Sequence, residues 1–152
     1  MIRIVPATVA IASRLKIREA DRQEVAAMSG RHPEEALIES IDLSCEAWAG
    51  MVDDEPIAVF GLAPLNIIVG IGSPWMLGSD LIESHSFEFL KLSRPIISHM
   101  HTTFPTLFNF VDERNVVSRR WLAWLGFFLH DPIIIGVEGR QFIPFERVRN
   151  NV

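Results

Sequence analysis

The sequence has one cysteine, two lysines, no tyrosine and no long apolar run. Cys45 alone cannot form an internal disulfide or supply a cysteine-based zinc site, so a reducing cytoplasm is the expected location. The apolar stretches 57–65 and 67–71 are far shorter than the roughly 20 residues of a membrane span, so no membrane association is expected. Residues 1–6 lack a charged region followed by an apolar stretch, so no export signal is expected.

Positive charge is also scarce. Fourteen Lys and Arg residues stand against nineteen Asp and Glu residues, which gives a formal net charge of −5. A dedicated nucleic-acid binder usually presents a basic face, so nucleic acid is not expected as a partner, although a local arginine patch at 119–120 stays open. His99 and His101 are two residues apart on an expected helix and face different sides of it, so no metal site is expected there.

What the chain does have is apolar content, at 49% of 152 residues. This is enough for one domain, residues 1–152, with a single substantial core. Hydrophobic periodicity and turn residues predict a mixed order of strands and helices. The expected strands are 2–5, 47–52, 56–62, 74–77, 107–111, 133–135 and 142–145, and 67–71 is a further candidate. The expected helices are 8–17 continuing into 20–28, 33–43, 80–99 and 115–125.

Local signals support several of these boundaries. Thr8 is a plausible helix cap, and Gly30 can end a helix in the left-handed conformation. Asp80 and Glu83 form a pattern like a capping box before the long helix. Pro95 is expected to kink or split that helix. Helices between strands, together with short hairpins, predict an α/β fold.

One stretch is more specific than the general pattern. It begins with Asn115, has a small residue at Ser118, continues as a helix and ends with Leu125-Gly126-Phe127. With the hairpin at 53–61 and the order of elements, it resembles the GNAT superfamily of N-acetyltransferases. The resemblance implies a mixed, mostly antiparallel central sheet flanked by helices on both faces. It also implies acyl transfer from acetyl-CoA to an amine.

A narrower resemblance rests on four further segments. They are 74–78, 89–94, 107–112 and 121–127, and they are similar to a group of small tailed-phage proteins described as acetyltransferase-like or as internal virion protein A. That similarity implies a phage-encoded protein acting in the host cytoplasm, with a part in virion assembly.

The sequence also departs from the GNAT pattern. The loop that usually reads Arg/Gln-x-x-Gly-x-Gly/Ala is here residues 80–86, without glycine, arginine or glutamine. Asp80 and Glu83 place negative charge where a diphosphate would bind, a repulsion of about 1–4 kcal/mol. The tyrosine that protonates the leaving thiolate in many members is replaced by Leu122, which cannot donate a proton.

The resemblance implies a set of site residues. Glu46 is the candidate general base, and His85 is a candidate base or phosphate ligand; a solvated strand end and a core histidine are the alternatives. For Ser84, Ser86 and Asn115, which are candidate contacts of acetyl-CoA, the alternative role is helix capping. The candidate acetyl-CoA contacts are Met76, Leu77, Gly78, Ser84, Ser86, Asn115 and Ser118. No metal is expected.

Two functions therefore stay open. The first is an acyl-CoA-dependent N-acyltransferase in which an unidentified amine attacks the thioester directly. The second is a GNAT-fold protein without turnover that binds a protein partner or forms a homo-oligomer, for example in virion assembly. Aromatic side chains at 121–127 and 142–145 are the expected interface in the second case.

Overall fold

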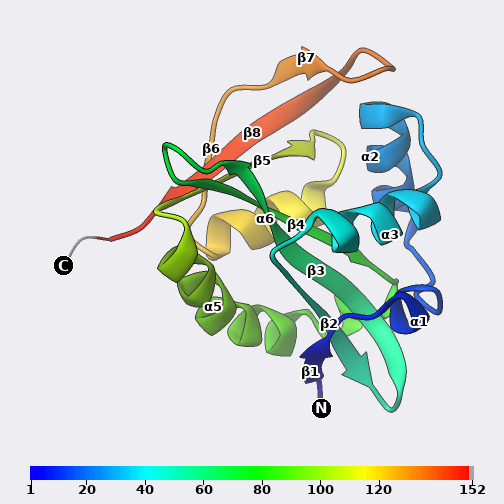
Figure 1. Cartoon of the computed structure of the whole chain (residues 1–152). Helices are drawn as coiled ribbons and strands as arrows, with labels where there is room; N and C mark the ends of the chain where they lie inside the picture. Colours follow the sequence, from blue (N-terminus) through cyan, green and yellow to red (C-terminus); the bar gives the residue numbers. More distant parts are fainter. Residues whose placement is uncertain (151–152) are drawn as a thin grey trace.

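One eight-stranded sheet organises the chain, in a computed structural model that describes residues 1–150 (Figure 1). The strand order is β1-β2-β3-β4-β5-β8-β6, and β7 also pairs with β8. The strands are β1 (Arg3–Pro6), β2 (Glu46–Val52), β3 (Glu55–Asn66), β4 (Ile71–Gly78), β5 (Thr106–Asp112), β6 (Phe128–Leu129), β7 (Ile133–Ile135) and β8 (Arg140–Val148). The helices are α1 (Val9–Ala12), α2 (Glu19–Ser29), α3 (Pro33–Leu43), α4 (Leu81–Ser84), α5 (Ser86–Thr103) and α6 (Val116–Trp124).

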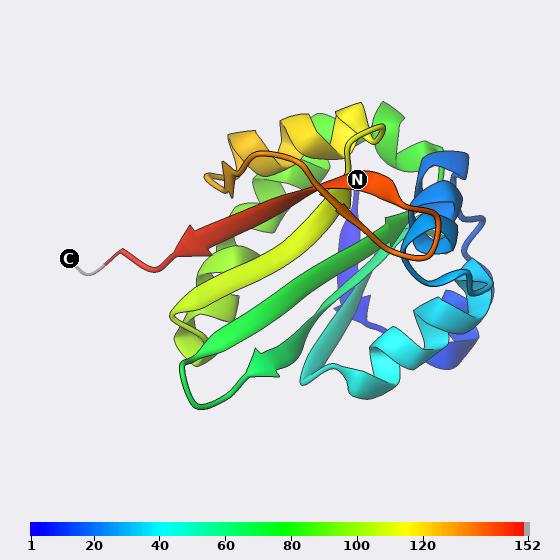
Figure 2. The ribbon, with the colours of Figure 1, turned by 90° about the horizontal axis from the view of Figure 1, so that it is seen from above.

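Helices cover both faces of the sheet, as the sequence predicts. Figures 1 and 2 show α1, α2 and α3 on one face and α5 and α6 on the other. Leu37 of α3 packs against Val59 on the first face, and Ile97 of α5 packs against Leu107 on the second. All strand pairs are antiparallel except β4 with β5, so the expected mixed and mostly antiparallel sheet is confirmed. Within residues 1–150 no helix has the length and apolar character needed to cross a bilayer.

The parallel pair β4–β5 is the irregular point of the sheet. The two strands pair only at Ile71 with Thr106 and at Gly72 with Leu107. Beyond this point β4 continues to Gly78 and β5 continues to Asp112, but the two strands no longer pair with each other. The sheet is therefore open between them. We call this opening, between residues 74–78 and 109–112, the β4–β5 split.

Several predicted boundaries are confirmed. The Thr8 hydroxyl accepts a hydrogen bond from the Ile11 N–H at 3.1 Å at the start of α1. The Asn115 side chain accepts one from the Ser118 N–H at 3.4 Å at the start of α6. Gly30 and Gly126, with φ of 71° and 90°, follow α2 and α6 in the left-handed conformation that favours glycine.

One strand prediction and one helix prediction are wrong. Residues 67–70 do not extend the sheet, because β3 runs on to Asn66 and these residues form the turn to β4. The Asn66 side-chain oxygen accepts the N–H groups of Ile68 and Val69 at 3.1 and 3.2 Å, which stabilises the turn. The expected helix over 8–28 is interrupted at 13–18, and these residues connect α1 to α2.

The long helix also differs from its prediction. It passes through Pro95 without a break. Pro95 and Lys91, the residue whose carbonyl loses its hydrogen-bond partner, are both exposed residues. The interruption occurs at His85 instead, and Asp80 makes no side-chain cap. His101, expected at the surface, is 3% exposed, and its Nδ1 is 3.0 Å from the Phe104 carbonyl oxygen.

Candidate functional site

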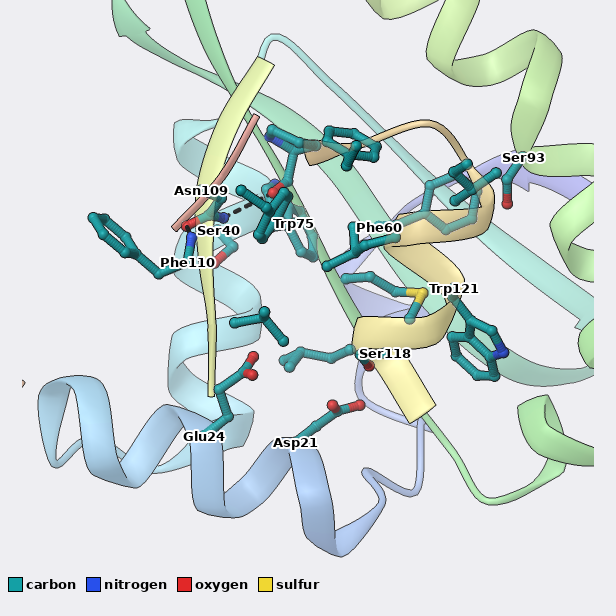
Figure 3. A pocket seen from close by; sticks show the side chains of 18 of the residues that line it. Asp21, Glu24, Ser40, Phe60, Trp75, Ser93, Asn109, Phe110, Ser118 and Trp121 are labelled. Atoms are coloured by element: carbon teal, nitrogen blue, oxygen red, sulfur yellow. Dashed lines mark hydrogen bonds between the residues drawn. The ribbon is translucent and has the colours of Figure 1, made fainter. Parts of the chain in front are cut away.

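A cavity of about 380 Å³ passes through the sheet at the β4–β5 split. The α2 and α3 side contributes residues such as Val25 and Ser40, and the α5 and α6 side contributes residues such as Ser93 and Trp121 (Figure 3). β4 contributes residues 74–77, and β5 contributes residues 109–111. Elements from both faces of the sheet therefore border this cavity, which lies where β4 and β5 separate.

Side chains and backbone close the split at its two ends. At the end where the strands still pair, the Asn109 side-chain amide donates to the Pro74 carbonyl at 2.7 Å across the gap. At the far end the Gly78 N–H donates to Asp21 Oδ2 at 2.8 Å, and the Gly78 carbonyl accepts the Arg18 N–H at 2.8 Å. The connection between α1 and α2 thus occupies the place at Gly78 that a neighbouring strand would take.

Met76 lies between these two closed ends. Backbone groups of alternate residues in a strand point to the same side, and those of Pro74 and Gly78 point toward β5. Met76 is two residues from each of them, so its N–H and C=O point to the same side. They face the split, where β5 does not pair with Met76. A backbone N–H in an apolar cavity can hold and polarise a carbonyl oxygen.

A buried polar network forms the far wall. Arg18 Nε and Nη2 donate to the two oxygens of Asp21 at 2.8 and 3.0 Å, and both side chains are 2% exposed. Arg18 Nη2 also donates to Ser118 Oγ at 2.6 Å. The Asn115 amide donates to Asp21 Oδ1 at 3.3 Å, so α1–α2 and α6 are joined by hydrogen bonds at this point.

Glu24 lies one turn beyond Asp21 on α2 and belongs to the cavity wall. Its Oε1 accepts the Asp112 N–H at 2.7 Å and the Asn115 amide at 3.5 Å. Burial raises the pKa of the Glu24 carboxyl to about 7, against these hydrogen bonds, and the nearby carboxylate of Asp21 adds to the rise. Figure 3 shows Glu24 and Asp21 projecting from α2 into the cavity.

The structure divides the acetyl-CoA contacts predicted from the sequence. Met76, Leu77 and Ser118 line the cavity. Gly78 and Asn115 belong to the closed far wall. Ser84 and Ser86 lie away from the cavity lining, and the Ser84 hydroxyl donates to the Leu81 carbonyl of its own helical turn at 2.8 Å, so it does not cap α5.

Neither catalytic candidate from the sequence lies at the cavity. Glu46 begins β2 at the surface, and its Oε2 is 2.8 Å from His99 Nε2. His85 lies half-buried at the break between α4 and α5. Arg18, Asp21 and Glu24 are site residues that were not predicted from the sequence. Asp21 and Glu24 are three positions apart on α2, a spacing that puts two carboxylates on one helix face, and Arg18 directly precedes this helix.

The site fits the thioester part of an acyl-CoA molecule but not its diphosphate. The apolar cavity and the Met76 N–H suit a thioester and the chain that carries it. The loop at 80–86 does not suit a diphosphate, because Glu83 lies there with Oε2 3.8 Å from Arg18 Nη1 and already faces the nearest cation. Within residues 1–150 no group of three or more His, Cys, Asp or Glu side chains could hold a metal ion.

Comparison with known proteins bears on the fold. No protein-family model and no curated protein matches the chain. Among solved structures it resembles a ribosomal-protein-alanine N-acetyltransferase from Brucella melitensis, with a TM-score of 0.74, 13% identity and coverage of 97% of this chain and 99% of that one. A GNAT-family acetyltransferase from Streptococcus pneumoniae matches with a TM-score of 0.68, 12% identity and coverage of 99% and 100%.

A third similar structure contains ligands. It is spermidine N-acetyltransferase from Vibrio cholerae in complex with CoA and spermine, with a TM-score of 0.69, 10% identity and coverage of 97% of this chain and 95% of that one. Identities of 10–13% establish similarity of architecture only. The chain therefore has the fold of the GNAT acetyltransferases.

Proposed function

We propose that the protein is an N-acyltransferase that moves an acyl group from a CoA-type thioester to an amine. The observation that carries this proposal is the cavity through the sheet at the β4–β5 split, with the backbone of Met76 facing it. A cavity bordered by elements from both faces can hold a donor and an acceptor next to each other, and proximity with orientation can lower the reaction barrier without a catalytic acid.

In the proposed reaction the donor supplies an activated acyl carbonyl. The Met76 N–H would hold the carbonyl oxygen, and the amine would approach from the α2 and α3 side. The C–N bond forms and the C–S bond breaks, and the sulfur leaves as a thiolate with the electron pair of that bond. The amine gives up one proton, and Glu24 is the carboxyl on the cavity wall without a cationic partner that could accept it.

A cavity-filling substitution tests this function. Ser93 lies on the inner face of α5 and lines the cavity, whereas Ser98 is exposed on the same helix. Replacement of Ser93 by Phe is expected to weaken acetyl-CoA binding at least tenfold, because the ring would occupy the space of the thioester. Isothermal titration calorimetry with Ser98→Phe as the control measures this. Absence of binding by the unchanged protein at millimolar acetyl-CoA would refute the proposal.

The alternative function, binding to a protein without turnover, has one specific observation in its favour. The end of β3 and the turn that follows it carry four apolar side chains, Leu65, Ile67, Ile68 and Val69, that are 56–96% exposed. Exposed apolar patches of this kind often form interfaces. The segment 142–145, expected from the sequence as an interface, is instead in the core, where Phe142 is fully buried. The part in virion assembly that the tailed-phage resemblance implies belongs to this alternative, whereas a phage origin is compatible with both functions.

A charged substitution in this turn tests whether the protein associates with itself through it. If the turn joins two copies of the chain, Ile68→Asp is expected to shift the protein from dimer to monomer in sedimentation velocity, because a carboxylate would be buried in the interface. Leu43→Asp, at an exposed position of α3, is the control and is expected to leave the oligomeric state unchanged. A monomer at all concentrations before any substitution would exclude self-association through this turn.

A further inference from the structure

Three carboxylates lie near the α2 end of the β4–β5 split, and two of them have an arginine partner. Asp21 forms a two-point ion pair with Arg18. Asp112 forms a second one with Arg114, at 2.7 and 3.0 Å. Glu24 forms no ion pair within 4 Å with a Lys, Arg or His nitrogen of residues 1–150, so it is the carboxylate of this group that lacks a direct cationic partner.

The Glu24 carboxyl still has the capacity to accept further hydrogen bonds. Both bonds that the described chain donates to it, from the Asp112 N–H and the Asn115 amide, reach Oε1. Its carboxylate faces the cavity (Figure 3). The raised pKa of Glu24 agrees with this placement, because a carboxyl in an apolar site without a cation favours its neutral form. A cationic hydrogen-bond donor on a ligand would supply the direct positive partner that Glu24 does not have within the described chain.

The remainder of the cavity wall is largely apolar. On the α2 and α3 side it is formed by residues such as Val25, Met28 and Trp75, and Glu24 and Asp21 are the charged residues on the wall among residues 1–150. A volume of about 380 Å³ corresponds to roughly a dozen water molecules. Such a space favours a small ligand with an apolar body and one polar group.

We propose that the α2 and α3 half of the cavity binds a compact monoamine with an apolar body, whose ammonium group pairs with Glu24. The inference rests on the proposed acyl transfer for the fate of this amine, which would be the acceptor. A polyamine fits less well, because Asp21 is already paired with Arg18 and a second ammonium would meet apolar side chains without a counter-charge.

Binding of cyclohexylmethylamine, measured by calorimetry without any thioester, tests the proposal. The neutral isostere cyclohexylmethanol and the polyamine spermidine are the comparison ligands. At pH 7 an alkylamine is protonated, as lysine is. The amine is expected to bind with a Kd at least ten times lower than that of the alcohol or of spermidine. Equal binding of amine and alcohol, or no binding of the amine, would overturn the proposal.

Two variants on α2 assign the effect to one carboxylate. Glu24→Gln keeps the shape and removes the charge, and it is expected to reduce the preference for amine over alcohol at least tenfold. Glu19→Gln makes the same change at an exposed position of the same helix and is expected to keep the preference. Binding of the alcohol to Glu24→Gln shows that the cavity is intact. A preference that survives in Glu24→Gln would contradict the role of this residue.

The design separates this inference from the proposed function. Amine binding without acetyl-CoA binding would refute acyl transfer and leave the amine site in place. Acetyl-CoA binding without a preference for the amine would refute the amine site and leave acyl transfer as the proposed function.

Discussion

Replacement of Arg18 by Leu is expected to lower the free energy of unfolding by about 3–5 kcal/mol, the cost of removing one partner of a buried ion pair. Arg18 and Asp21 are each 2% exposed, and Arg18 donates to both oxygens of Asp21. Without the guanidinium, Asp21 keeps only the Gly78 N–H and the Asn115 amide as donors. A carboxylate left in this position is poorly solvated. Urea denaturation followed by circular dichroism measures the loss.

Arg22, in the first turn of α2, provides the control. Arg22 pairs with Glu34, but both side chains are substantially exposed, so Arg22→Leu is expected to cost at most about 1 kcal/mol. The double variant Arg18→Leu with Asp21→Leu removes both charges and is expected to be more stable than Arg18→Leu alone. A loss below about 1 kcal/mol for Arg18→Leu would show that the far wall of the split is not held by this pair.

The sequence predicts much of the fold because local chemistry marks its boundaries. Asn115 caps α6 through its own side chain, and Gly126 ends the same segment with a positive φ that other residues rarely adopt. Such signals need only neighbours a few residues away. The failures have the same physical basis, since the exposed side of α5 tolerates Pro95 and a side-chain bond from Asn66 closes the turn at 67–70.

The site is less predictable because its contacts are remote in sequence. Arg18 bonds to Ser118, 100 positions away, and the Glu24 carboxylate accepts from Asp112, 88 positions away. No local pattern reports such pairs, and an arginine in a connection between helices is usually a solvated charge. Met76 and Leu77 are predictable from the GNAT resemblance, because the position of the split follows from the strand order of the fold.

The second large effect expected is a pH-dependent gain in stability when Glu24 is replaced by Gln. The pKa of Glu24 is about 7 in the folded protein, against 4.5 as the ordinary value. The folded state therefore binds the proton more tightly than the unfolded state. The contribution of this group to stability is retained below pH 4.5 and is lost as the pH rises toward 7. At 1.36 kcal/mol for each pH unit, the loss is on the order of 3 kcal/mol.

Glutamine carries no such charge, so the difference in unfolding free energy between Glu24→Gln and the unchanged protein is expected to shift in favour of the variant between pH 5 and pH 8. Glu34→Gln is the matched control, because the hydrogen bond from Arg22 lowers the pKa of Glu34, so that Glu34 is ionised in both the folded and the unfolded state between pH 5 and pH 8 and the stability difference of this variant is expected to stay nearly constant there. Urea titrations at both pH values measure the shift, and a difference that stays constant with pH would contradict the burial of the Glu24 charge. A carboxylate that costs stability at neutral pH is typical of functional sites rather than of cores. Its uncompensated charge is the feature that an ammonium ligand would neutralise, so the stability and the binding experiments test the same property of Glu24.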